Sequence, residues 1–189
     1  MAKLFLLTLF LSQSIFSPAQ DSTDDSTLRS LIKLDLGLQG IGISFEPKLS
    51  NKMSIDFSLG AGGAYEISEE GISYEWNIPH SAFYISAVPK FYYNRQKRSV
   101  QGKNNKLNSG NYIGARIRYT TSSYAPYQGF SNNALLLNVH WGLQRALGRR
   151  FIFNTHVGAG YARDVISNFG TIYPAIDFKF SYVLARLNK

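Results

Sequence analysis

Apolar and polar residues alternate along most of this chain. Near its end, Ile172, Ile176 and Phe178 share one parity, while Asp177 and Lys179 share the other. A period of two residues predicts a β-strand with one apolar face and one polar face. A soluble sheet buries its apolar face, whereas a membrane barrel turns that face outward to lipid. Alternation alone does not decide between them.

The alternation predicts about eight strands and no helix. They fall at residues 28–38, 41–49, 53–66, 81–94, 111–122, 133–147, 151–164 and 171–185. Most have the length, roughly 10 residues, that a tilted strand needs to cross a bilayer. Short turns such as residues 49–52 and 147–150 alternate with longer segments at 67–80, 123–132 and 165–170, with exceptions at 39–40 and 95–110. This rhythm is typical of an all-β, eight-stranded antiparallel up-and-down transmembrane β-barrel.

The aromatic residues of the apolar face gather at its two ends. Those at one end are Tyr65, Phe83, Tyr119 and Tyr161, and those at the other are Phe45, Phe91, Tyr93, Phe151, Phe153 and Tyr182. Aliphatic residues such as Ile85, Leu137 and Val157 lie mostly between them. Two aromatic belts around an aliphatic band match the two water–lipid interfaces, so we expect the apolar face to point outward.

The polar face combines small residues with charges of both signs. We expect an ionic cluster in the lumen, made of Lys33, Asp35, Glu46, Asp56, Lys90, Arg116, Arg118, His140, His156, Asp177 and Lys179. These charges should be paired, because each unpaired buried charge costs several kcal/mol. Pro89 and Pro174 oppose this model, since each removes a ladder donor inside a predicted strand or marks a bulge.

Above the ionic cluster, small residues and tyrosines suggest a shallow pocket open to the outside. Its candidate residues are Gly60, Gly62, Tyr84, Gly158, Gly160 and Tyr173. A small ligand or an acyl chain would dock there. In the alternative, the tyrosines fill the space, as side chains do in narrow barrels.

The N-terminus has the pattern of a secretory signal. A charged Lys3 precedes an apolar run and a small-residue site, so we expect a signal peptide at residues 1–19, a polar leader at 20–27 and a barrel domain at 28–189. The chain has no cysteine, which excludes disulfides, a lipid-attachment cysteine and thiolate metal sites. A net charge of +8 is usually a reason to consider nucleic acid, but a secreted chain rarely meets that partner.

The segments GISFEPKLSNKMSIDFSLGAGGAY and AIDFKFSYVL carry a resemblance to a known class. The pattern as a whole resembles the small eight-stranded outer-membrane proteins of Gram-negative bacteria, the OmpA/OmpX-type barrels. The resemblance implies a monomer in the outer membrane, surrounded by its lipids. It also places many basic residues, such as Lys97, Arg98 and Arg150, on the periplasmic side, near anionic head groups or the cell wall.

Two groups of residues invite a chemical reading. His80 and Ser81 adjoin a loop with Glu69, Glu70 and Glu75, but neighbouring side chains on a strand point to opposite faces, and no motif matches a lipid-modifying enzyme. His140 and His156 are expected in the lumen, where zinc would need a third ligand such as Asp177. Such histidines more often hydrogen bond within a polar network. We therefore expect no catalysis, no metal and no cofactor.

These features together favour an outer-membrane barrel with a structural, adhesive or ligand-binding role and no open pore. Loops 67–80 and 123–132 would carry the contacts, the second being rich in Tyr, Gly and Asn. One alternative is an outer-membrane lipid-modifying enzyme. A second alternative is a secreted soluble barrel of the lipocalin type.

Overall fold

The computed structural model describes residues 27–68, 71–76, 81–122, 124–125, 129–130 and 133–187. The predicted signal peptide and all of the polar leader except Thr27 lie outside the described residues.

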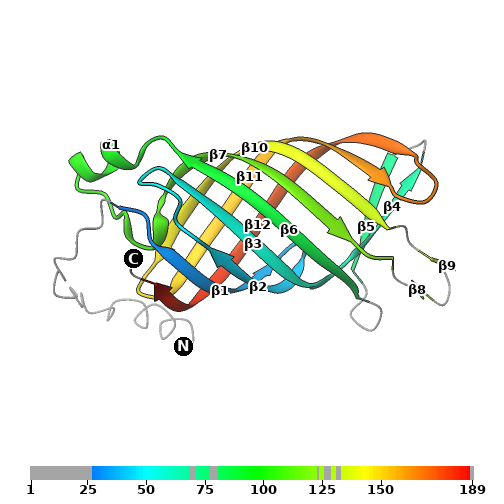
Figure 1. Cartoon of the computed structure of the whole chain (residues 1–189), viewed down its shortest axis with the longest axis horizontal. Coiled ribbons are helices and arrows are strands. Elements are labelled where there is room, and N and C mark those ends of the chain that lie inside the picture. Colours follow the sequence, from blue (N-terminus) through cyan, green and yellow to red (C-terminus); the bar gives the residue numbers. More distant parts are fainter. Residues whose placement is uncertain are drawn as a thin grey trace, which may run out of the picture.

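Eight long strands close into one barrel (Figure 1). They are β1 (Ser30–Gly37), β2 (Gly40–Glu46), β3 (Met53–Gly62), β6 (Ala82–Tyr92), β7 (Gly110–Thr120), β10 (Ala134–Leu147), β11 (Phe151–Asp164) and β12 (Gly170–Leu187). Each pairs antiparallel with its neighbours in the chain, and β12 closes the barrel against β1. The all-β, eight-stranded up-and-down architecture predicted from the alternation is confirmed.

Two small hairpins and one helical connection lie outside the predicted pattern. β4 (Ala64–Ser68) pairs with β5 (Gly71–Glu75), and β8 (Tyr124–Ala125) pairs with β9 (Gly129–Phe130), both within segments predicted mainly as loops. The connection between β6 and β7 contains the helix α1 (Arg95–Val100) and a 3-10 turn, η2 (Lys106–Asn108). A helix of six residues is too short to show a helical period. No helix in the described ranges is long and apolar enough to cross a membrane.

The barrel carries apolar side chains outside and charged side chains inside. Ile85 and Val139 are 61% and 63% exposed, whereas Lys33 and Asp56 are 1% and 2% exposed. Aromatic residues remain exposed at both ends, namely Phe83, Tyr119 and Tyr161 at one end and Phe45, Phe91, Tyr93 and Phe151 at the other. Tyr65 corrects the predicted outer belt: it is buried, because it lies in β4 rather than in a wall strand. This distribution is the inverse of a soluble protein.

The strands differ in length, and the wall is therefore uneven. β12 pairs with β11 as far as Gly170, but its pairing with β1 ends at Lys179. The β1–β2 hairpin, drawn in blue, stops well short of the far end of the barrel (Figure 1). Beyond this hairpin, one edge of β12 pairs with no strand among the described residues.

The two prolines differ in their effect on the hydrogen-bonded pairing of the barrel strands. Pro174 lies in the unpaired stretch of β12, so its missing N–H removes no bond to β1. Pro89 stays paired with Ile55 of β3, but the ladder between β6 and β7 is interrupted at Val88 and Pro89. Only Pro89 therefore interrupts the barrel ladder.

Candidate functional site

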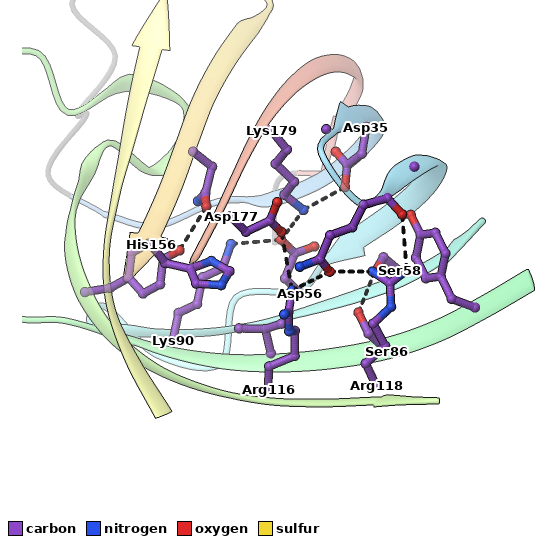
Figure 2. Close-up of a pocket in the computed structure, with 17 residues that line it drawn as sticks. Asp35, Asp56, Ser58, Ser86, Lys90, Arg116, Arg118, His156, Asp177 and Lys179 are labelled. Atoms are coloured by element: carbon purple, nitrogen blue, oxygen red, sulfur yellow. Dashed lines mark hydrogen bonds and ion pairs between the residues drawn. The ribbon is translucent and has the colours of Figure 1, made fainter. Parts of the chain in front are cut away.

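The lumen contains the ionic residues predicted from the alternation. Asp56 of β3 lies at the centre, where its Oδ2 atom accepts from three lysines, of which Figure 2 draws Lys90 and Lys179. The Nζ atoms of Lys33, Lys90 and Lys179 lie 3.1, 2.8 and 3.2 Å from it. Lys179 also donates to Asp35 over 2.7 Å. Residues from four different strands are thus joined through one carboxylate.

Glu46 extends this network toward the end of the barrel where β1 begins and β12 ends. Its Oε2 atom pairs with Lys33 at 2.7 Å, and its Oε1 atom accepts from Ser54 and from the Tyr92 hydroxyl. Lys90 also reaches Gln144, which accepts a hydrogen bond over 3.2 Å. The buried charges therefore have neutral as well as ionic partners, as a charge removed from water requires.

A second group of charges lies around Gln39, in the β1–β2 turn. The Nη1 atoms of Arg116 and Arg118 donate to Gln39 Oε1 over 3.0 and 2.7 Å. Arg116 also pairs with Asp177 at 3.3 Å. Arg118 instead stacks over the Tyr84 ring, 3.9 Å from its centre, and forms no salt bridge within the described part of the chain.

The two predicted lumen histidines are neighbours. The His140 and His156 rings stack with centres 4.0 Å apart, and Tyr112 meets His140 edge-on. His140 Nδ1 lies 2.7 Å from the side-chain amide of Asn138. No cluster of three or more metal-ligating groups suited to an ion occurs among the residues placed by the structure. These contacts are those of a polar network.

A small cavity of about 50 Å³ lies in the middle of this network. Its lining includes Asp35, Asp56, Asp177, His156 and Lys179 (Figure 2). The Oδ1 atoms of the three aspartates meet no hydrogen-bond donor among the residues that the structure describes. A cavity of this size suits a few water molecules, which are the usual partners of such buried oxygens.

Tyrosine side chains lie against two glycines of the predicted outward pocket. A Cβ atom on Gly60 would lie 2.8 Å from the Tyr84 hydroxyl, and one on Gly160 would lie 2.6 Å from the Tyr173 ring. The glycines leave room for the tyrosines, which fill this part of the lumen. Tyr84 also lines the 50 Å³ cavity, whereas the glycines at 60, 62, 158 and 160 do not.

The β4–β5 hairpin covers the lumen above these tyrosines. Tyr65 and Ile67 of β4 are buried against residues of the opposite wall, including Leu136 and Tyr173. Since β4 follows β3 whereas Leu136 and Tyr173 belong to β10 and β12, the hairpin crosses the barrel mouth. Sequence reasoning missed this cap because the alternation of β4 looks like a continuation of β3.

The opposite end of the lumen is filled by the connection between β6 and β7. Leu107 of η2 is buried with Leu31, Ile152 and Val183, and its carbonyl accepts from Gln144. Asn108 then bonds both the N–H and the carbonyl of Arg29. Residues 105–109 of the long basic segment at 95–110, an exception in the sequence pattern, thus form a plug under the barrel, whereas most of residues 96–104 are exposed.

Some residues of the lumen network were not predicted. Tyr112 and Asn154 hydrogen bond to each other over 2.9 Å. Both lie on the polar parity of their strands, which could have indicated that they face the lumen. Gln39 and Asn108 lie in a turn and a plug, where no periodicity indicates a direction.

Of the residues considered for catalysis, the structure describes Ser81, Glu75 and His140. His80, Glu69 and Glu70 lie outside the described residues. Glu75 is solvent exposed on β5. His140 is deep in the lumen, where it contacts Asn138, Tyr112 and His156.

The chain was compared with family models, curated proteins and solved structures, and similarity is found among the solved structures. No family model and no curated protein matches the chain. Among solved structures, the chain is similar to the outer membrane protein AlkL, determined by solid-state NMR in DMPC lipid bilayers, with 10% identity and a TM-score of 0.37 over 89% of this chain and 92% of that one. The closed strand ladder, rather than this similarity, defines the fold.

Proposed function

We propose that this protein is a monomeric β-barrel of the bacterial outer membrane with a structural, adhesive or ligand-binding role. One observation supports the membrane location above all: the outside is apolar and the inside is ionic. A bilayer stabilises such an outer surface. In water, the exposure of Ile85, Val139 and their neighbours would cost a free energy of about 25 cal/mol per Å² of apolar area.

Membrane fractionation combined with gel mobility tests this proposal. We expect the protein in the outer-membrane fraction, and we expect the folded barrel to migrate differently before and after boiling. Recovery in the soluble fraction without detergent would instead favour the secreted lipocalin-type alternative. That alternative would also require its apolar residues to point into the lumen, where the structure has Lys33, Glu46 and Asp56.

We propose that the barrel conducts no steady ion current. The plug around Leu107, the network around Asp56 and the cap around Tyr65 lie one above another along the lumen. Planar bilayer recordings of the purified protein should show no stable open channel. Stepwise conductance of the kind seen in porins would contradict this part of the proposal.

We further propose that the role is not enzymatic. The lipid-modifying alternative requires Ser81, His80 or His140 to act on a lipid, and His140 is enclosed by Asn138, Tyr112 and His156. Alanine variants of Ser81, His80 and His140 should leave the membrane lipid composition unchanged. A lipid species lost in one of these variants would support the enzyme.

The charge distribution suggests how the barrel is oriented. Basic residues such as Lys97, Arg98 and Arg150 lie at the end that carries the plug, whereas Glu66 and Asp164 lie toward the other end. With the plug in the periplasm, the basic residues would contact anionic inner-leaflet head groups or the cell wall. The outer end would then present loops 67–80 and 123–132 to partners.

A further inference from the structure

The uneven wall leaves a groove on the lipid-facing side of the barrel. Beyond the β1–β2 hairpin, β12 is paired with β11 alone, and Pro174 lies in this stretch. Because proline has no N–H, the free edge offers no donor at this position. The β4–β5 hairpin then covers the gap, so that the groove lies between β12, the β1–β2 turn and β5.

The groove has a volume of about 360 Å³, within the range of small-molecule sites. Its lining is mostly apolar and includes Leu38, Ile72, Tyr74, Tyr173, Pro174 and Ile176. No charged residue lines it. An uncharged, flexible hydrocarbon therefore fits this surface better than a polar ligand does.

The hydroxyl groups of Tyr74 and Tyr173 already have partners within the protein. The Tyr74 hydroxyl donates to the Leu38 carbonyl over 3.1 Å and accepts from the Gly63 N–H over 3.0 Å. The Tyr173 hydroxyl lies 2.9 Å from the Asn138 amide. An apolar occupant would leave these hydrogen bonds intact, so its entry would leave neither of these two hydroxyl groups unpaired.

The groove is continuous with the apolar outer surface. Ile176 lines it while being 60% exposed, and Ile172, four residues before it on the same face, is 79% exposed. Gln39 lines both the groove and the lumen cavity, and its contacts with Arg116 and Arg118 separate the apolar space from the ions. The accessible source of an occupant is thus the surrounding bilayer.

We propose that this groove binds one acyl chain of a membrane lipid, which enters sideways from the bilayer. This inference rests on the proposed membrane location. The chain would lie along Pro174 and Ile176 and reach Ile72 and Tyr74 beneath the hairpin. Lipids that merely surround the barrel would contact Ile172 and Val139 but not Ile72, which packs against the buried cluster under the cap.

Photolabelling in nanodiscs tests the proposal. The purified barrel is reconstituted with phosphatidylcholine carrying a diazirine on its acyl chain, irradiated, and mapped by mass spectrometry. We expect labels on Ile72 or Tyr74 as well as on Val139. Ser73 also lines the groove, so Ser73→Trp should fill it and reduce the labels on Ile72 and Tyr74 to background while Val139 stays labelled.

The matched control is Ser68→Trp, which makes the same change on the same hairpin at a residue that does not line the groove. Gel mobility before boiling verifies that each variant is folded, and Ser73→Phe replaces Ser73→Trp if the latter does not fold. Labels on Val139 without labels on Ile72 or Tyr74, or labels that persist in the filled variant, overturn the inference alone. Absence of label on Val139 overturns the membrane location, and the groove inference with it.

Discussion

Lys33 of β1 and Glu46 of β2 form an ion pair of 2.7 Å between two side chains that are almost completely excluded from solvent. Lys33 also reaches Asp56, and Lys90 lies 3.7 Å from Glu46. The Glu46 carboxylate therefore neutralises part of the positive charge of two lysines, both of which are buried in the interior of the barrel.

Replacing Glu46 by glutamine should destabilise the barrel strongly. The amide keeps the shape but leaves Lys33 and Lys90 with one carboxylate fewer, and breaking a buried pair in this way costs about 3–5 kcal/mol. Urea unfolding of the reconstituted protein, followed by gel mobility, measures the change. Glu75→Gln is the control, since Glu75 is exposed and its loss should change stability by less than about 1 kcal/mol. Equal effects of the two substitutions would contradict the network described around Asp56.

An arginine on the outer surface should distinguish a lipid environment from water. Val139 is 63% exposed in the middle of β10, so Val139→Arg should lower the free energy of unfolding in lipid by about 2–4 kcal/mol. Val100→Arg makes the same change in α1, where the side chain is 85% exposed, and should have little effect. Folding yields and urea titrations in vesicles compare the two. A harmless Val139→Arg would favour a water-facing surface.

Removing the Leu107 side chain should loosen the plug. Leu107 is 5% exposed and packs with Leu31, Ile152 and Val183, so Leu107→Ala should cost about 2–5 kcal/mol through lost contacts and the remaining cavity. Leu49→Ala is the comparison, because Leu49 is 57% exposed in the turn between β2 and β3. Unfolding titrations report the stability, and amide hydrogen exchange at residues 103–109 should accelerate in the first variant only. Unchanged exchange there would show that Leu107 does not hold the plug.

The two prolines should respond differently to replacement by alanine. Pro89→Ala supplies a donor where the β6–β7 ladder is interrupted, so it should stabilise the barrel by about 0.5–1.5 kcal/mol. Pro174→Ala supplies a donor at the unpaired edge of β12, where no strand accepts it. Hydrogen exchange should therefore show a protected amide at position 89 and a faster one at position 174. Equal protection at both positions would mean that the edge at Pro174 is covered.

Most of the wall was predictable because a strand's period of two residues is a local property. The predicted strand at 151–164 coincides with β11, and the strand at 133–147 differs from β10 by one residue. The placement of Lys33, Asp56 and Lys179 inside follows from the same parity. The cap was missed because β4 continues the alternation of β3 after Gly63, although the chain there leaves the barrel wall.

The sequence by itself determined which side chains share each face of a strand, since parity along the strand separates the two faces. The closed barrel shows that the apolar face lies outside and the ionic face lines the lumen. Only the tertiary structure decided that one carboxylate, Asp56, would meet three lysines, because that contact depends on how β1, β3, β6 and β12 are staggered when the barrel closes. Closure likewise determined where Leu107 and Tyr65 pack. Unequal strand lengths opened the edge at Pro174, a property of neighbouring strands that no single segment encodes.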